Sequence, residues 1–299
     1  MKSFNVIGYS KFWLGFSAAL IMASIVAVLV LKPNFGIDFT GGSLLEVKAE
    51  DTSNQELREE LSAAGREAIV QSSEDNSYFV RLGSITEEEH QEILTILRAN
   101  HPELTESRFD SVGPVIGDEL KQNTAIAIVV LLGLIALYIA WAFRKVSEPV
   151  PSWKYGVITL LAALHDVIIP IGIFAILGRT LGYQIDIAFV AAILTILGYS
   201  INDTIVVLDR TRENLARYRH STKSFAEIVN QSIVETLGRS VNTTLTTLLP
   251  LVAIFAIGGS TTRPFVLALI LGILAGAYSS IFFASPLLVA WDKWSRRSK

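Results

Sequence analysis

Six long runs of hydrophobic residues, separated by shorter polar stretches, dominate the chain. A bilayer core about 30 Å thick needs about 20 predominantly apolar residues to be crossed by a helix. The runs that meet this test lie at residues 12–31, 124–143, 155–177, 187–208, 241–257 and 264–291. The first run is long for a secretory signal core, and no small-residue cleavage site follows it, so we expect an uncleaved anchor. The pattern predicts six transmembrane helices.

The segment between the first two runs follows a different pattern. Short alternating or apolar stretches predict strands at residues 43–48, 67–72, 78–82 and 106–112, and helices at residues 53–64 and 86–99. Thr86 and Glu89 have the spacing of a capping box at the start of the second helix. The order β-α-β-β-α-β is that of a ferredoxin-like domain. We therefore divide the chain into 1–32, an α+β extracytoplasmic domain at 33–121, and a five-helix region at 122–299.

Composition agrees with a membrane bundle that carries one modest polar domain. Of the 299 residues, 51% are hydrophobic and only 18% are charged, and the mean hydropathy is +0.46. These values are too apolar for a single soluble domain. The absence of cysteine excludes disulfides and thiolate metal sites. The predicted fold class is an α-helical membrane bundle of six transmembrane helices, with a ferredoxin-like domain between helices 1 and 2.

Basic residues orient this bundle. Loops on the cytoplasmic side of a membrane carry an excess of Lys and Arg. With the N-terminus in the cytoplasm, the two short outside loops contain only Arg179 and Arg263 as basic residues, and the acidic segment 33–121 also lies outside. The sequence thus predicts both termini in the cytoplasm. The basic residues placed inside are Lys2, Lys11, Arg144, Lys145, Lys154, Arg210, Arg212, Arg217, Arg219, Lys223, Arg239, Lys293, Arg296, Arg297 and Lys299.

A carboxylate interrupts the fourth hydrophobic run. Asp203 follows Asn202 within Gly198-Tyr199-Ser200-Ile201-Asn202-Asp203-Thr204. At helical periodicity, one face carries Thr195, Gly198, Tyr199, Asn202, Asp203 and Val206. A charged side chain at the bilayer centre costs about 2.5–3.5 kcal/mol on insertion scales, so it is rarely present without a role. Two interpretations are open: a helix–helix hydrogen bond, or a proton or ion site.

Other polar residues also have two interpretations each. Arg239, at the predicted entrance of the fifth helix, is either a snorkelling anchor or part of a hydrated path with Asn242, Thr243, Thr246 and Thr247. His165 and Asp166, within the third run, support a proton path or serve packing, since too few further ligands accompany them for a metal. Asn202 orients Asp203 or joins helices.

Several short motifs, in this order along six predicted helices, resemble the SecF branch of the SecD/SecF family of bacterial protein-export membrane proteins. The resemblance covers nearly the whole chain. The motifs are Phe35-Gly36-Ile37-Asp38-Phe39-Thr40-Gly41-Gly42, Ser111-Val112-Gly113-Pro114 with Gly117, His165-Asp166-Val167, Gly198 to Asp203, Asp209-Arg210, and Arg212-Glu213-Asn214.

The resemblance implies half of a resistance-nodulation-division type bundle, completed by the six helices of a SecD partner. It implies further that the pair works with the Sec translocon channel in the bacterial cytoplasmic membrane, acts on unfolded polypeptide, and uses the proton gradient to promote export. In the family, the residues matching Asp203 and Arg239 are linked to proton passage.

The glycine-rich motif at residues 35–42 has the composition of a turn. Gly36, Gly41 and Gly42 permit backbone conformations closed to other residues, and Asp38 caps turns well. We expect a joint between the first helix and the outer domain, with Gly113 and Pro114 forming its counterpart at the return. In the last run, a ridge of small residues predicts close helix packing against a helix that the sequence does not identify: Ala268, Gly272, Gly276 and Ser280.

Two other classes of function compete with a proton-driven export subunit. One is a scaffold that stabilises the translocase without transport, and the position of Asp203 within a predicted membrane helix argues against it. The other is half of a small-molecule efflux pump, against which the small outer domain argues. No phosphate loop or nucleotide fingerprint is present, so we expect neither ATP hydrolysis nor enzymatic activity. We also expect no cofactor, no metal and no nucleic-acid partner.

Overall fold

The computed structural model describes residues 5–72, 76–142, 150–259 and 261–297. It divides into two compact units. The helical unit comprises Met1–Pro33, Ile128–Ile176 and Phe189–Lys299, and the sheet unit comprises Asn34–Ala127 and Leu177–Ala188. Four residues used to orient the chain, Lys2, Arg144, Lys145 and Lys299, lie outside the described ranges.

The described residues contain six helices that are long and apolar enough to cross a membrane, and each predicted run lies within one of them apart from the undescribed residue 143. After the short η1 (Ile7–Tyr9), they are α1 (Ser10–Leu31), α5 (Pro114–Ala142), α6 (Ser152–Thr180), α7 (Ile187–Arg217), α8 (Phe225–Ile257) and a last helix in three parts. Those parts are α9 (Arg263–Ser279), a π-helical turn η2 (Ser280–Ala284) and α10 (Ser285–Arg297). The chain is thus a multi-pass membrane protein.

Helix α8 begins much earlier than the hydrophobic run predicts. Its polar first part is helical because Ser224 and Glu227 form a capping box, with Ser224 N and Glu227 Oε2 2.7 Å apart. Arg239 consequently lies near the middle of α8 and not at its entrance. The hydropathy pattern missed this extension because it responds to apolar residues and not to helix length.

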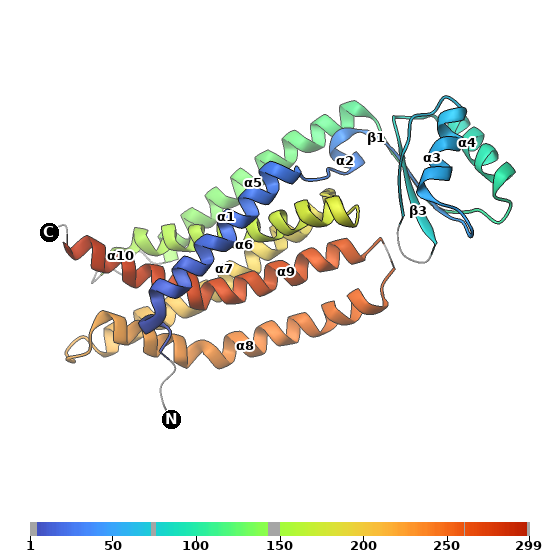
Figure 1. The fold of residues 1–299 in the computed structure, drawn as a ribbon. Coiled ribbons are helices and arrows are strands. Elements are labelled where there is room, and N and C mark those ends of the chain that lie inside the picture. Colours follow the sequence, from blue (N-terminus) through green and yellow to red (C-terminus); the bar gives the residue numbers. More distant parts are fainter. Residues whose placement is uncertain (1–4, 73–75, 143–149, 260, 298–299) are drawn as a thin grey trace. The chain divides into compact units, whose positions relative to one another are not determined.

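Small residues let the helices of the helical unit approach closely. A Cβ atom on Gly276 of α9 would lie 2.9 Å from Ser200 Cβ of α7, and one on Gly272 would collide with Ile196. The ridge of small residues therefore faces α7 of this same chain. In Figure 1, α8 lies beside α9, and the two helices are in contact. Close backbone approach of this kind is a principal source of helix association in lipid.

The sheet unit has the predicted order of strands and helices. Its elements are β1 (Gly42–Lys48), α3 (Asn54–Ala63), β2 (Ile69–Ser72), β3 (Ser77–Leu82), α4 (Glu87–Asn100) and β4 (Thr105–Val112). The strands form an antiparallel sheet in the order β2-β3-β1-β4. Figure 1 shows α3 and α4 on one face of this sheet.

An apolar core fills the space between the sheet and its two helices. Leu45 and Val47, two positions apart on β1, are fully buried, as are Leu57 of α3 and Leu97 of α4. Residues two positions apart on a strand point to the same face, here the face toward α3 and α4. Glu46, which lies between them, is buried as well. The capping box that the sequence predicts at Thr86 and Glu89 is present.

Candidate functional site

A cluster of polar side chains lies in the interior of the helical unit. Asp166 comes from α6 and Asp203 from α7, and both are among the buried residues of the bundle. Serines on the surrounding helices face them: Ser200 of α7, Ser240 of α8, Ser279 of α9 and Ser280 of η2. Serine suits this position because it is small enough for close helix packing and still donates a hydrogen bond.

Asp166 has hydrogen-bond partners at both carboxylate oxygens. Its side chain is completely buried. Oδ1 lies 2.8 Å from His165 Nδ1, and Oδ2 accepts from Ser279 Oγ at 2.7 Å and from Ser200 Oγ. These bonds link α6, α7 and α9. A buried carboxylate with three partners is held firmly in place, because the loss of any partner leaves a polar atom unsatisfied.

Asp203 is only partly satisfied. Its Oδ1 accepts a hydrogen bond from Ser240 Oγ at 2.7 Å, which joins α7 to α8. Its Oδ2 is buried and has no hydrogen-bond partner among the described residues. The residue is 8% exposed, so water reaches it only at its edge. Burial of a carboxylate oxygen without a partner is costly for the ionised form unless a cation or a hydrogen-bond donor lies nearby.

Arg239 lies close to Asp203. It directly precedes Ser240 on α8, and its charge is near enough to interact with the Asp203 carboxylate. The arginine is exposed in this chain. No carboxylate lies within ion-pair distance of it in the part of the chain that the structure describes. Asn202 is also exposed, and the hydrogen bond to Asp203 comes from Ser240 instead.

His165 packs among aromatic rings next to Asp166. Its ring centroid lies 5.8 Å from that of Tyr278 and 5.1 Å from that of Phe283. Nε2 is buried without a hydrogen-bond partner among the described residues. The imidazole thus both fills space and bonds Asp166, which combines the two roles that the sequence left open.

Sequence reasoning missed most of the hydrogen-bond donors of this cluster. Ser240 directly follows Arg239, just before the fifth apolar run, and Ser279 lies within the last run; nothing in their spacing distinguishes them. Ser200 lies in the motif that contains Asp203, but it bonds Asp166. On α8, Thr243, Thr246 and Thr247 donate to backbone carbonyls of the same helix, which leaves their oxygen lone pairs free to accept; the hydrated path beside Arg239 stays a prediction.

A second group of motif residues meets in the sheet unit. Gly36 N donates to Ile185 O at 2.9 Å, beside a parallel bridge between Phe35 and Ile185. Asp38 Oδ2 accepts from Ile187 N, the first residue of α7, at 2.9 Å. Asp38 therefore supplies a carboxylate to a helix N-terminus, where backbone N–H groups lack partners. The motif also contains a short helix, α2 (Ile37–Thr40), that the sequence did not predict.

Two glycines of this motif are required by the backbone. Gly41 has φ +69°, and a Cβ atom there would lie 2.9 Å from Pro114 Cα. Gly42 has φ +113°, and its Cβ would lie 2.7 Å from Leu82 O. Gly113 has open space around it, and Pro114 begins α5. Motifs that are far apart in the sequence thus form one joint at the start of β1 and of α5.

Arg81 of β3 anchors this joint to the sheet and was missed by the sequence analysis. Its guanidinium donates to Asn34 Oδ1 at 2.9 Å and to Gln71 Oε1 at 3.1 Å. Burial lowers the pKa of the Arg81 guanidinium, because a low-dielectric surrounding disfavours the charged form. An arginine on a strand gives no sign in the sequence of which distant loop it will contact.

Two family models match this chain, and together they contain the buried polar cluster and the glycine-rich motif. Residues 92–294 match the C-terminal family of the protein export membrane proteins SecD and SecF, and residues 26–53 match the SecD/SecF GG motif. The first match contains the buried polar cluster together with Gly113 and Pro114, and the second contains Gly36, Asp38, Gly41 and Gly42. Fold and site thus define a multi-pass protein-export membrane protein.

Individual proteins that are similar to this chain belong to the same family. The chain is 42% identical over 291 residues to protein translocase subunit SecF of Thermobaculum terrenum, covering 92% of this chain and 90% of that protein. It is 41% identical to protein translocase subunit SecDF of Thermus thermophilus, covering 96% of this chain and 38% of the relative. A crystal structure of SecDF from the latter organism, described as a translocon-associated membrane protein, matches with a TM-score of 0.87 at 38% identity, covering 97% of this chain and 39% of that one. The chain belongs to the SecD/SecF family, on its SecF side.

Proposed function

We propose that the chain is the SecF-type half of a complex that uses the proton gradient to promote protein export. It spans about two-fifths of the SecDF chain of Thermus thermophilus, which supports a second, SecD-type half as its partner. The partners would also include the Sec translocon channel, an unfolded polypeptide and the lipid bilayer. The location would be the bacterial cytoplasmic membrane with both termini in the cytoplasm, which places a ferredoxin-like domain at 33–121 outside and the remaining helices at 122–299.

The observation that carries the proton-coupling proposal is the difference between the two buried aspartates. Asp166 has three hydrogen-bond partners, whereas Asp203 accepts one well-formed hydrogen bond, from Ser240; its Oδ2 is buried without a hydrogen-bond partner among the described residues, and the Ser280 side chain lies nearby. A group that carries protons must be stable with and without the proton. Asp203 meets this condition better, because protonation lets Oδ2 become a donor without breaking an existing bond.

Arg239 supplies the means of switching. A nearby cation favours the ionised carboxylate, and its withdrawal favours the protonated one. Arg239 and Ser240 are adjacent on α8. A small shift of α8 against α7 would therefore change both the distance from the Arg239 charge to Asp203 and the hydrogen bond from Ser240 to Asp203. Each proton that crosses the full membrane potential releases about 2.3 kcal/mol per 100 mV, which is enough to bias such a shift. Asn202, exposed on α7, and the Asp166–His165 pair would support the path.

The glycine joint would transmit the shift to the outer domain. Asp38 bonds the first residue of α7, the helix that carries Asp203, and Gly41 packs against Pro114 at the start of α5. Gly36, Gly42 and Gly113 complete this joint. A movement of either helix end would therefore be passed to the segment before β1 and to the segment after β4.

The test is protein export by membrane vesicles that contain this chain and its SecD-type partner, with and without a proton gradient. We expect Asp203→Asn to abolish the stimulation by the gradient, because the amide cannot be ionised. Asp209→Asn is the matched control: it makes the same chemical change on the same helix, at a carboxylate 50% exposed and ion-paired to Arg212. That variant should retain the stimulation.

Assembly with the partner must be measured in parallel by co-purification. Normal assembly with lost stimulation supports proton coupling through Asp203. If Asp203→Asn exports at the normal rate and keeps its response to the gradient, the proton role is wrong and the scaffold hypothesis gains.

A further inference from the structure

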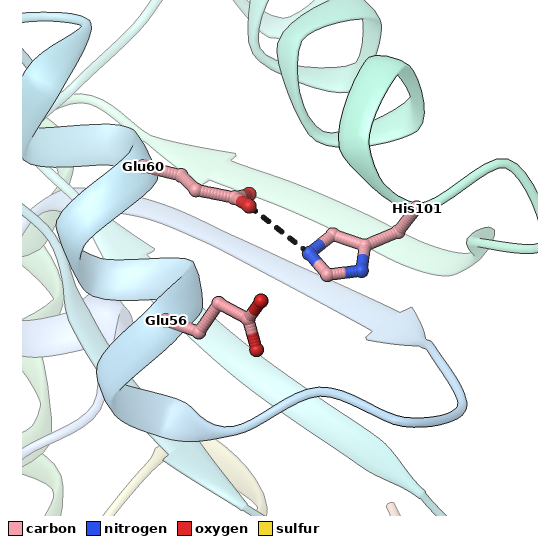
Figure 2. A group of neighbouring side chains, drawn as sticks. All are labelled: Glu56, Glu60 and His101. Atoms are coloured by element: carbon pink, nitrogen blue, oxygen red, sulfur yellow. Dashed lines mark hydrogen bonds and ion pairs between the residues drawn. The ribbon is translucent and has the colours of Figure 1, made fainter.

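Two glutamates and a histidine converge in the sheet unit, away from the motifs that identify the family. Glu56 and Glu60 lie one turn apart on α3, and His101 is the residue at the C-terminal end of α4. Figure 2 shows both carboxylates and the Nε2 edge of the imidazole directed toward the same space. One ligand atom from each residue lies within 4.8 Å of the other two.

The separations suit a small cation. His101 Nε2 and Glu60 Oε1 are 3.2 Å apart. Two ligands at zinc-ligand distances on a tetrahedral ion are about 3.3 Å apart. Glu56 is exposed, so rotation of its side chain can bring the carboxylate closer to the other two ligands. Among the described residues, this side chain accepts a hydrogen bond from Thr52 Oγ1 at 3.2 Å.

A hydrogen bond between His101 and Glu60 does not satisfy the whole group. Glu60 Oε2 is buried and has no hydrogen-bond partner among the described residues. The side chains of His101 and Glu60 are only 10% and 15% exposed, so water screens them poorly. Glu56 adds a second negative charge at i−4, where like charges repel on a helix. A divalent cation would neutralise both carboxylates and give the buried oxygen a partner.

We propose that Glu56, Glu60 and His101 form a binding site for a divalent transition-metal ion, with zinc as the best match. One imidazole nitrogen and two carboxylate oxygens are ligands that Zn²⁺ accepts, and the exposed side of Glu56 leaves room for a water as the fourth ligand. The imidazole disfavours Mg²⁺, which prefers oxygen ligands. The bound ion would join α3 to the end of α4 and so brace the helical layer of the sheet unit.

A second histidine in the same unit shows that acidic neighbours alone do not create such a site. His90 has Glu87 at 3.2 Å from Nδ1 and Glu106 at 3.1 Å from Nε2. These carboxylates occupy opposite nitrogens of the ring, so they cannot share one ion with it. This arrangement provides an internal control with the same residue types.

The experiment is titration of the full-length chain in detergent, stripped of metal with a chelator, with zinc chloride or magnesium chloride. Calorimetry measures affinity, and elemental analysis after gel filtration measures the zinc content. We expect one zinc per chain and no comparable magnesium binding. Glu56→Gln and His101→Gln should each weaken zinc binding by at least about 10–100-fold, the loss that even outer-shell changes cause at metal sites. Glu87→Gln, the control beside His90, should leave it unchanged.

Glu56→Gln is the decisive variant because Glu56 is exposed and takes no part in the His101–Glu60 hydrogen bond. If the group is only an ion pair, the wild-type chain binds no more zinc than the Glu56→Gln and His101→Gln variants, and no stoichiometric zinc is found after gel filtration. Zinc binding that Glu56→Gln and His101→Gln both leave intact would place the ion elsewhere. Either result overturns the proposal. Amide hydrogen exchange of α3 and α4 in each variant verifies that the sheet unit remains folded.

Discussion

The two units of the molecule place polar groups in opposite ways. The interior of the helical unit contains Asp166, Asp203 and His165 with several serines, and hydrogen bonds among these side chains join α6, α7, α8 and α9. Between the sheet and helices of the sheet unit, the core is a cluster of apolar side chains, and Arg66, Glu89 and Glu92 form ion pairs at its surface.

The difference follows from the solvent of each unit. In water, burying apolar area is the main source of stability, so the core of the sheet unit is mainly apolar, although a few titratable side chains of this unit, such as Glu46 and His90, are also buried. In lipid, the surroundings are as apolar as leucine, and helices associate through close packing and interhelical hydrogen bonds. An internal polar cluster is therefore compatible with a membrane bundle, where it also provides groups that can hold a proton.

The largest stability effect should come from removing the satisfied aspartate. Asp166→Leu leaves Ser200, Ser279 and His165 without their shared acceptor, so we expect a loss of about 3–5 kcal/mol. Unfolding of the purified chain in detergent measures it, and Ser279→Ala, which removes one donor, should cost only about 0.6–1.7 kcal/mol. Equal costs for the two variants would mean that the network does not act through Asp166.

The second prediction concerns the apolar core of the sheet unit, where a substitution that creates a cavity should be destabilising. Leu97 is fully buried between α4 and the sheet, and Leu97→Ala should destabilise this unit by about 2–5 kcal/mol through lost burial and the cavity left behind. Hydrogen exchange should rise in β1, β3 and α4 while α7 and α9 stay protected. Leu245→Ala, at an exposed position on α8, is the control and should leave exchange in the sheet unit unchanged.

The smallest effect should come from a surface carboxylate and depend on pH. The pKa of Glu89 is held below its usual value first by the Thr86 backbone N–H and then by the Arg66 guanidinium. A lowered folded-state pKa contributes stability that is present above the unfolded pKa of about 4.3 and is lost as the pH falls through the folded value.

Glu89→Gln should therefore destabilise the sheet unit slightly at pH 7 and approach the wild-type stability below about pH 4. Denaturant unfolding of both proteins across this range measures the difference. The neighbouring exposed Glu88→Gln serves as the control and should show no such convergence. A Glu89→Gln effect that is independent of pH would mean that packing, and not charge, explains the contribution.

The sequence by itself determined the six membrane helices and the strand and helix order of the sheet unit. Both depend on local periodicity: the length of apolar runs in one case, and alternation with caps such as Thr86 in the other. It also singled out Asp203 as a candidate, because a carboxylate in an apolar run is conspicuous on its own; the structure shows that this side chain is buried, and its role in proton passage stays a prediction. Element boundaries were less accurate where a polar stretch, such as the start of α8, continues a helix.

Only the tertiary structure decided which residues meet. Asp38 has the composition of a local turn cap, yet it bonds the first residue of α7, far along the chain. Ser240 and Ser279 became hydrogen-bond donors to Asp203 and Asp166 because α8 and α9 pack against α7 and α6. Local pattern fixes the face of a helix on which a residue lies, but the partner depends on how helices pack, and packing depends on side chains that no single window of sequence contains.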